Sequence, residues 1–245
     1  MDLGGKVAFI TGGARIGATV AQSLAQRGCR VVLTYRNSRQ ASEDTLRQVR
    51  SLGSDGRAVR CDTTADSQVR RAVGETVSAF GRLDIVVNMA SVYERTPYRS
   101  ISNADWERNL TANLTSAHLT VLHAAPALRA KGGGRVVNFT DWVAASGRPR
   151  YKGFVPYYAA KAGIIGLTQA QALELAPKVL VNAIAPGPIL PPKNLKNEEV
   201  RNVTKVTPLG RWGGAGEIAK AVLFLCETDF VTGECIRVDG GRHLF

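Results

Sequence analysis

Long apolar runs, paired cysteines and clustered histidines are all missing from this chain of 245 residues. No stretch approaches the roughly 18 consecutive apolar residues that a membrane-spanning helix requires, which excludes a helical membrane protein. The 4 cysteines form no C-x-x-C pair and the 3 histidines lack zinc-ligand spacing, so we expect plain thiols and no metal site. Residues 1–6 include an acid and no apolar segment of the kind found in secretion signals, and we expect a cytoplasmic protein.

Acidic residues are also scarce, with 20 Asp and Glu against 32 Lys and Arg and a net charge of +12. Such a balance can indicate binding to nucleic acid or to a membrane surface. Here the basic residues are scattered, and no helix combines them with interleaved aromatic side chains. The sequence therefore favours an enzyme that binds anionic small ligands, with no nucleic acid and no membrane as partner.

Short apolar segments alternate with helical patterns along the whole chain. The predicted strands are Lys6–Thr11, Arg30–Tyr35, Ala58–Cys61, Leu83–Asn88, Arg135–Phe139, Val179–Ala185 and Cys235–Val238. The predicted helices are 16–28, 38–52, 65–80, 102–130, Tyr157–Leu175 and 215–226. Apolar strands that alternate with helices predict a parallel sheet covered on both faces. We expect a single α/β domain over 1–245, three-layered, doubly wound and of the Rossmann type.

Two segments rich in glycine, proline and basic residues interrupt this rhythm, namely Ala145–Pro156 and Pro186–Pro208. Each follows a predicted strand, at the carboxyl edge where doubly wound sheets bind ligands. We expect the first, about 145–156, to form a wall of the site and the second, about 186–208, to form a substrate lid. The alternative for each is a plain long connection.

A glycine-rich turn, Thr11–Gly17, joins the first predicted strand to the first helix. Free backbone N–H groups and the positive end of the helix dipole can bind a pyrophosphate there. Enzymes that use NAD carry an acid about 20 residues further on, which binds the ribose hydroxyls. This chain has no acid there but has Arg36 and Arg39, which together with Arg15 could bind a 2′-phosphate. The sequence thus favours NADPH over NADH.

Tyr157 and Lys161 are four residues apart and share one face of a predicted helix. An ammonium beside a phenol stabilises the phenolate and lowers its pKa from about 10. We therefore expect Tyr157 to act as a general acid near neutral pH. The spacing is common by chance, so it gains meaning only together with other motifs.

In combination these motifs resemble the short-chain dehydrogenase/reductase family over essentially the whole chain. The matching pieces, in the family's order, are the turn Thr11–Gly17, Cys61–Asp62, Asn88–Ala90, Asn113, Tyr157, Lys161, Pro186–Gly187 and Val238–Gly241. The resemblance implies hydride transfer with NADPH and a homotetramer assembled through the long helices. It also implies a role for each matching residue.

By this resemblance Tyr157 is the acid, Lys161 its partner on the nicotinamide ribose, and Asn113 the holder of a water in the proton relay. Asp62 would meet the adenine, and Asn88 would lie along the cofactor. The residues expected to bind the cofactor are Gly12, Arg15, Ile16, Gly17, Tyr35, Arg36, Asp62, Asn88, Ala90, Tyr157, Lys161, Pro186 and Gly187.

Two features resemble the pteridine reductase branch of the family. Asp141 stands where most members carry a catalytic serine, and Tyr93 lies in the loop after the fourth strand. The resemblance implies that Asp141 joins Tyr157 in catalysis and that Ser91, Tyr93, Asp141 and Tyr157 contact a pterin. A flat heteroaromatic ring suits an aromatic platform, and its N–H groups suit a carboxylate acceptor.

The chain also departs from the family pattern. The turn Thr11–Gly17 is one residue shorter than usual, and it carries Arg15 alone where pteridine reductases have two basic residues. Which of the two roles Arg15 fills stays open. Met89 replaces an asparagine, and the segment between Asp141 and Tyr157 is longer than usual.

From these observations we expect an NADPH-dependent reductase that acts on a pteridine-type substrate, such as a dihydropterin or a dihydrofolate-like molecule. One alternative is a 3-oxoacyl or general carbonyl reductase, against which Asp141 argues. A second alternative is a non-catalytic NADP(H)-binding sensor, against which the intact pair of Tyr157 and Lys161 argues.

Overall fold

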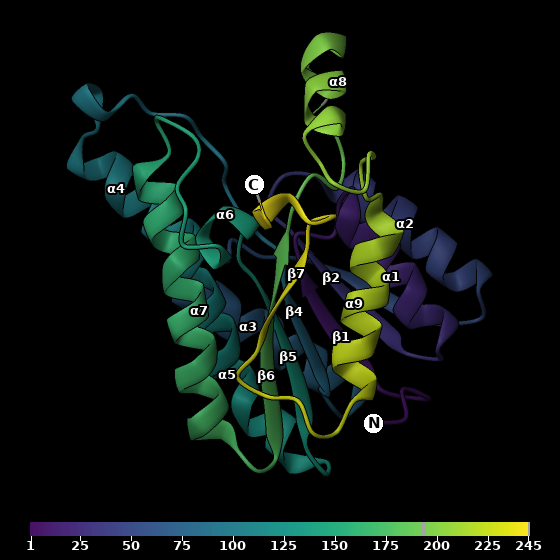
Figure 1. Ribbon diagram of the computed structural model, residues 1–245. Coiled ribbons are helices and arrows are strands. Elements are labelled where there is room, and N and C mark those ends of the chain that lie inside the picture. The colour runs from purple at the N-terminus through teal and green to yellow at the C-terminus, as the bar shows by residue number, and fades with distance from the viewer. Residues whose placement is uncertain (193–194, 245) are drawn as a thin grey trace.

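A seven-stranded sheet runs through the centre of the protein in the order β3-β2-β1-β4-β5-β6-β7 (Figure 1). The computed structural model describes residues 1–192 and 195–244. Every neighbouring pair of strands is parallel. The strands are β1 (Val7–Thr11), β2 (Arg30–Tyr35), β3 (Gly56–Arg60), β4 (Ile85–Asn88), β5 (Gly134–Phe139), β6 (Val179–Pro186) and β7 (Cys235–Val238).

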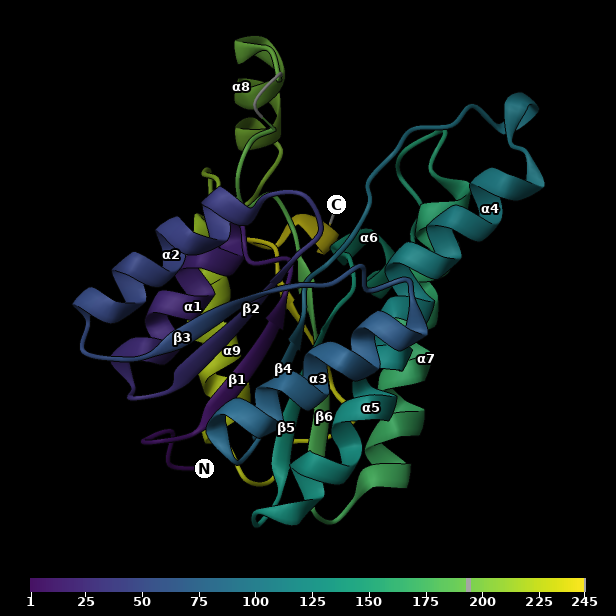
Figure 2. The same cartoon turned by 180° about the vertical axis from the view of Figure 1, so that it is seen from behind.

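Helices cover both faces of the sheet. α1, α2 and α9 pack on one face, and α3, α5 and α7 pack on the other (Figures 1 and 2). The α-helices are α1 (Ile16–Gln26), α2 (Arg39–Ser51), α3 (Asp66–Phe80), α4 (Asn103–Leu110), α5 (Ser116–Ala130), α6 (Trp142–Ala145), α7 (Val155–Leu175), α8 (Asn197–Lys205) and α9 (Ala215–Glu227). Short 3-10 turns lie at Tyr98–Ser100 and Arg242–Leu244.

Strand β1 shows why polar and apolar residues do not alternate along the strands of this sheet. Val7 and Phe9 enter the core beneath α3, α5 and α7, whereas Ala8 and Ile10 enter the core beneath α1 and α9. Because successive side chains of a strand point to opposite faces, a sheet covered on both sides needs apolar residues at every position. The predicted three-layer, doubly wound α/β fold is confirmed.

The long helix predicted over 102–130 is interrupted. Ser102 and Asp105 form the expected capping box, and α4 begins at Asn103. A π-helical turn, Thr111–Thr115, then separates α4 from α5. Such a turn takes up an extra residue without ending the helix, so hydrophobic spacing gave no sign of it.

The two irregular segments contain helices that the sequence did not predict. The first holds the end of α6, which is a single turn that begins directly after Asp141. The second holds α8, none of whose residues is buried and which extends away from the body of the protein (Figures 1 and 2). Residues 193 and 194 of the expected lid fall outside the described residues. In the described part, no helix is long and apolar enough to cross a membrane.

Sheet topology fixes where a ligand can bind. The chain runs from β1 outward to β3, then returns to β4 on the other side of β1. Crossovers on the two sides of such a switch point leave opposite faces of the sheet, so a crevice opens at the carboxyl ends of β1 and β4. The turn after β1, the loops after β4 and β5 and the segment after β6 all border this crevice.

Candidate active site

The turn after β1 brings its backbone unusually close to the neighbouring loop. Gly12 has a φ of +75°, and a Cβ there would lie 2.9 Å from the backbone nitrogen of Ala90. A Cβ on Gly17 would lie 2.4 Å from the carbonyl oxygen of Gly12. Only glycine fits at either position, and the open side of the turn faces a cavity. This is the cradle that a pyrophosphate requires at a helix N-terminus.

Two adjoining cavities share Gly12, Ala14, Met89 and Ser91, and together they form one long groove. One end lies by Tyr35 and Arg36 at the end of β2, and the other lies by Tyr157 and Lys161 on α7. A dinucleotide is long enough to need such a groove across the sheet edge, so the residues present fit one. The predicted residues that line the groove are Gly12, Arg15, Ile16, Gly17, Tyr35, Arg36, Asp62, Ala90, Ser91, Asp141, Tyr157, Lys161, Pro186 and Gly187.

At the β2 end, Arg36 is the arginine that lines the groove. Its side chain is 62% exposed, and its guanidinium lies 4.0 Å from the carboxylate of Asp62. The Asp62 pKa is lowered chiefly by the hydrogen bond from the Thr64 hydroxyl, and the charge of Arg36 makes a smaller contribution in the same direction. Arg39, expected beside Arg36, instead lies with its guanidinium 4.0 Å from Glu43.

Arg15 lies at the opposite end of the groove from Arg36. It has a φ of 54° and a ψ of −109°, and it is the residue directly before α1. Its guanidinium donates a hydrogen bond to the carbonyl of Pro191, 3.1 Å away. In this structure Arg15 thus lines a different part of the groove from Arg36, and its joining Arg36 around a 2′-phosphate stays a prediction. The shortened turn holds Arg15 at the end that contains Tyr157.

Asn88 lies beneath the groove. Its amide donates a hydrogen bond of 2.9 Å to the Asn138 side chain, and Asn138 in turn donates to the Thr168 hydroxyl at 3.0 Å. These bonds link β4, β5 and α7 through the buried core. The Asn88 side chain thus serves the fold, and its neighbours Met89 and Ala90 are the residues that face the groove.

The other end of the groove holds a carboxylate paired with a phenol. The Tyr157 hydroxyl donates a hydrogen bond of 2.9 Å to one Asp141 carboxylate oxygen. The other oxygen accepts from the backbone N–H of Val143 at 2.8 Å, because Asp141 is the N-cap of α6. Lys161 is 3% exposed, and its ammonium donates to the Phe139 carbonyl at 2.9 Å.

Burial dominates the ionisation of these groups. It raises the Asp141 pKa, against the hydrogen bonds from Val143 and Tyr157 and the charge of Lys161. It also lowers the Lys161 pKa to about 8. The Tyr157 pKa lies well above its usual value because of burial and then the Asp141 charge.

The expectation that Lys161 lowers the Tyr157 pKa is therefore wrong for this structure. The Lys161 ammonium lies 5.8 Å from the centre of the Tyr157 ring, whereas the Asp141 carboxylate accepts a hydrogen bond from the Tyr157 hydroxyl. Burial of the hydroxyl raises the Tyr157 pKa most, and the Asp141 carboxylate raises it further. The Tyr157 hydroxyl is therefore the proton-bearing member of this pair, and Asp141 accepts from it.

Comparison of the sequence with a family model and of the fold with solved structures identifies the family of this chain. A family model described as enoyl-(acyl carrier protein) reductase matches residues 13–243. A short-chain dehydrogenase/reductase from Serratia marcescens has a TM-score of 0.92 and 31% identity, over 99% of this chain and 100% of that one. This chain belongs to the short-chain dehydrogenase/reductase family.

Curated relatives within the short-chain dehydrogenase/reductase family carry names of their own. A 3-oxoacyl-acyl-carrier-protein reductase of Staphylococcus aureus is 32% identical over 98% of each chain. One of the same name from Aquifex aeolicus is 35% identical, again over 98% of each chain. A blue fluorescent protein from a metagenomic library, solved in complex with NADPH, has a TM-score of 0.90 and 29% identity over 99% of each chain. The curated names agree with the 3-oxoacyl alternative rather than with a pteridine reductase.

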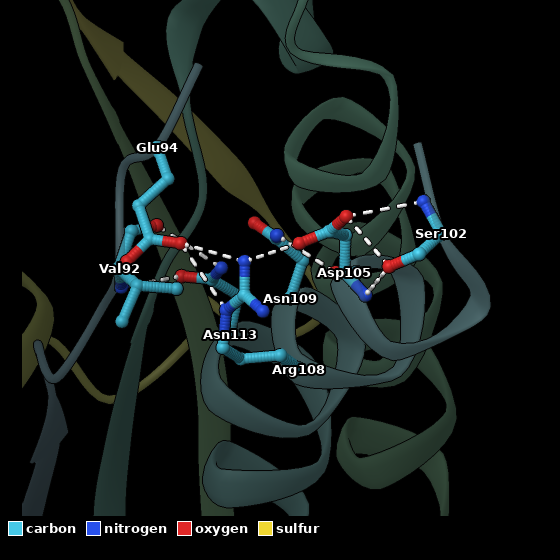
Figure 3. Close-up of polar contacts among 7 residues, drawn as sticks. All are labelled: Val92, Glu94, Ser102, Asp105, Arg108, Asn109 and Asn113. Atoms are coloured by element: carbon cyan, nitrogen blue, oxygen red, sulfur yellow. Dashed lines mark hydrogen bonds and ion pairs between the residues drawn. The ribbon is translucent and has the colours of Figure 1, made fainter. Parts of the chain in front are cut away.

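The resemblance to the family implies that Asn113 holds a water. In this structure its side chain instead makes hydrogen bonds to other protein groups. Its side-chain oxygen accepts from the Ser91 hydroxyl at 2.6 Å and from the Val92 N–H at 3.1 Å. Its amide donates to the Val92 carbonyl at 3.1 Å, and Figure 3 shows Asn113 facing Val92 from the helix. The side chain holds the loop after β4 and has little capacity left for a water.

Arg108 on α4 fastens the same loop from a second side. Its guanidinium donates to Glu94 at 3.1 and 3.2 Å and to Asp105 at 2.6 Å (Figure 3). Asp105 is itself held by the Ser102 N–H and hydroxyl. Glu94 and Val92 flank Tyr93, so these contacts position the Tyr93 ring.

Tyr93 lies in an aromatic cluster beside Asp141. Its ring stacks on Phe154 with centroids 4.5 Å apart, and it meets the Tyr157 ring edge-on at 4.8 Å. Tyr93 is still 58% exposed, so ring surface remains for a ligand. Sequence reasoning missed Phe154, Trp106 and Tyr151, which line a cavity of about 220 Å³ here. Tyr151 and Phe154 fall within the predicted wall at about 145–156, just before α7, whereas Trp106 lies in α4 and had no such signal.

Proposed function

We propose that this member of the short-chain dehydrogenase/reductase family reduces a pteridine-type substrate with NADPH. The family assignment makes the chain an NAD(P)-dependent oxidoreductase. The observation that carries the proposal is the hydrogen bond between Tyr157 and Asp141, formed beneath the exposed ring of Tyr93. A carboxylate and a phenol beside an aromatic surface match the N–H groups and the flat ring of a pterin.

The groove supports a division of binding roles. Tyr35, Arg36 and Asp62 would hold the adenosine end of NADPH, and the turn of Gly12 and Gly17 its pyrophosphate. The residues that would hold the nicotinamide end are Ile16, Lys161, Pro186 and Gly187. When bound, NADPH supplies the hydride.

Asp141 and Tyr157 would manage the substrate and its proton. The Asp141 carboxylate can accept hydrogen bonds from the ring N–H and amino groups, which orients the ring. The Tyr157 hydroxyl would donate the proton that a reduced ring nitrogen takes up. Burial raises the pKa of Asp141, so its carboxylate is a stronger hydrogen-bond acceptor for the Tyr157 hydroxyl than an exposed carboxylate would be.

The second candidate function is reduction of a 3-oxoacyl thioester, which the names of the curated relatives favour. The reacting group would then be a carbonyl whose oxygen becomes negative in the transition state. An ionised Asp141 offers that oxygen no donor and repels its charge. For this reason we rank 3-oxoacyl reduction below reduction of a pteridine-type substrate.

A non-catalytic sensor of NADP(H) is the remaining alternative. Such a protein needs the groove but not the proton-donating groups. Here Lys161, Tyr157 and Asp141 are present and lie together, and Tyr93 adds exposed aromatic surface. These features favour an enzyme.

A comparison of substrates tests the proposal directly. With NADPH, kcat/KM for a dihydropterin is expected to exceed kcat/KM for a short 3-oxoacyl thioester by about tenfold or more. The physical reason is the Asp141 carboxylate, which binds ring N–H groups and opposes an oxyanion. A higher value for the thioester would favour 3-oxoacyl reduction instead. If neither substrate led to any oxidation of NADPH, the result would support the sensor.

The choice of cofactor gives a second test. We expect kcat/KM with NADPH to exceed kcat/KM with NADH by about tenfold or more, because the exposed guanidinium of Arg36 can pair with a 2′-phosphate. Arg36→Asp should erode or reverse this preference. Arg39→Asp is the matched control, since Arg39 lies beside Glu43, and it should keep the preference. Equal use of the two cofactors by the unmodified enzyme would contradict the prediction.

We propose further that the chain is one domain over 1–245, with a wall at about 145–156 and a lid at about 186–208. The resemblance to the family supports assembly into a homotetramer and a cytoplasmic location. Sedimentation of the purified enzyme tests the tetramer.

A further inference from the structure

The cavity that adjoins Asp141 and Tyr157 reaches Arg150, which lies in the loop between α6 and α7. The Arg150 Nε atom is buried and has no hydrogen-bond partner among the residues that the structure describes. Arg150 as a whole is half-buried, and an unpaired donor at the buried Nε atom is unfavourable because that atom loses hydration without gaining a partner.

An aromatic ring holds Arg150 in place. The centre of its guanidinium lies 5.5 Å from the ring centroid of Trp142, a residue 5% exposed. Arg242 also contacts this ring, at 5.6 Å, but donates a hydrogen bond to the Val206 carbonyl. Stacking of this kind fixes the orientation of a guanidinium and leaves its N–H groups free to bind a ligand.

No acid of the surrounding described residues neutralises Arg150. The loop 147–153 contains Arg148, Arg150 and Lys152 and no acidic residue. The one carboxylate that lines the cavity is Asp141, which already accepts from Tyr157 and from a backbone N–H. A cavity with an unpaired cation at one side and a reacting pair at the other is suited to a substrate with a separate negative group.

We propose that Arg150 binds an anionic group, a carboxylate or a phosphate, carried on a side chain of the substrate. Its planar N–H groups can make paired hydrogen bonds to either anion. The inference rests on the proposed function in one respect, because it assumes that the ring of the same substrate lies at Asp141 and Tyr157. Arg150 would then select among substrates that share this ring.

Three dihydropterins test the proposal, one with an uncharged hydroxyalkyl tail, one with a carboxylate tail and one with a phosphate tail. The measured quantity is kcat/KM for each anionic substrate divided by kcat/KM for the uncharged one. Arg150→Met keeps much of the aliphatic stem, and it should lower this ratio by about ten- to a hundredfold. Arg150→Lys keeps the charge but not the planar N–H groups, so its ratio should fall in between.

Arg148→Met is the matched control, because Arg148 belongs to the same loop and is exposed. It removes the same charge from the enzyme, and its ratio should stay within about twofold of the unmodified enzyme, since exposed charges are screened. A loss for the carboxylate alone identifies a carboxylate substrate, and a loss for the phosphate alone identifies a phosphate substrate. An equal loss in Arg148→Met would assign the effect to net charge and overturn the proposal.

A binding measurement separates this inference from the proposed function. Calorimetric titration with N-benzoylglutamate and with phenyl phosphate, at saturating NADP⁺, requires no turnover. Suppose that the unmodified enzyme reduces no dihydropterin but binds one of these anions, and that Arg150→Met weakens this binding about tenfold. The pteridine assignment would then fail, and the anion site at Arg150 would stand. If Arg150→Met binds both anions as the unmodified enzyme does and keeps the kinetic ratio, the Arg150 site is refuted.

Discussion

Tyr157→Phe is expected to lower kcat by about 10² to 10⁴, the usual effect of removing a positioned proton donor. The Tyr157 hydroxyl is the group that donates to Asp141, and its raised pKa keeps it protonated and able to donate. Binding of NADPH should change by less than about threefold, because the lost hydroxyl acts on the substrate. The two measurements are kcat under saturating substrate and the dissociation constant of NADPH by fluorescence titration.

Tyr158→Phe serves as the control for this substitution. Tyr158 follows Tyr157 in α7, where each residue turns the side chain by about 100° around the helix axis. Its loss of a hydroxyl should reduce kcat only mildly. If Tyr158 proved essential and Tyr157 dispensable, the assignment of the proton donor would be wrong.

Asp141→Ser is expected to shift the preference between two kinds of substrate by about tenfold or more. For a dihydropterin, the change removes the carboxylate that accepts ring N–H groups, and kcat/KM should fall at least about tenfold. For a simple ketone, the change removes a negative charge from beside the developing oxyanion and adds a hydroxyl donor. The rate on the ketone should therefore be unchanged or higher.

Asp141→Asn tests the same site with the shape preserved. The amide can still cap α6 by accepting from the Val143 N–H, but it has no charge and no acidic proton. Pterin reduction should fall in this variant as well. The experiment compares kcat/KM for both substrates in the unmodified enzyme and both variants. Undiminished pterin reduction by Asp141→Ser would remove the argument for a pteridine substrate.

Local patterns were sufficient to predict much of the fold. β2 and β7 have the predicted bounds, and the capping box of Ser102 and Asp105 begins α4 as expected. Each depends on residues that are neighbours in the sequence. Tyr157 and Lys161 share a helix face for the same reason, because helix geometry alone sets their relation.

The contacts that the sequence did not reveal join segments that are distant along the chain. Asn113 bonds to Ser91 and Val92, and Phe154 stacks on Tyr93. Such pairs follow from packing, which residue spacing does not encode. The direction of the Tyr157 pKa was missed likewise, since it depends on burial and on the approach of Asp141 rather than on Lys161.

The backbone at Arg15 has a consequence for engineering this enzyme. Among the described residues, Arg15 alone combines a positive φ with a side chain other than glycine. Backbone in such a sparsely populated region is less stable by about 1–3 kcal/mol. Glycine would adopt it without strain, yet it would remove the guanidinium that lines the groove near Tyr157. A search for heat-resistant variants would thus favour glycine at this position, at the loss of the hydrogen bond that joins the turn after β1 to the Pro191 carbonyl.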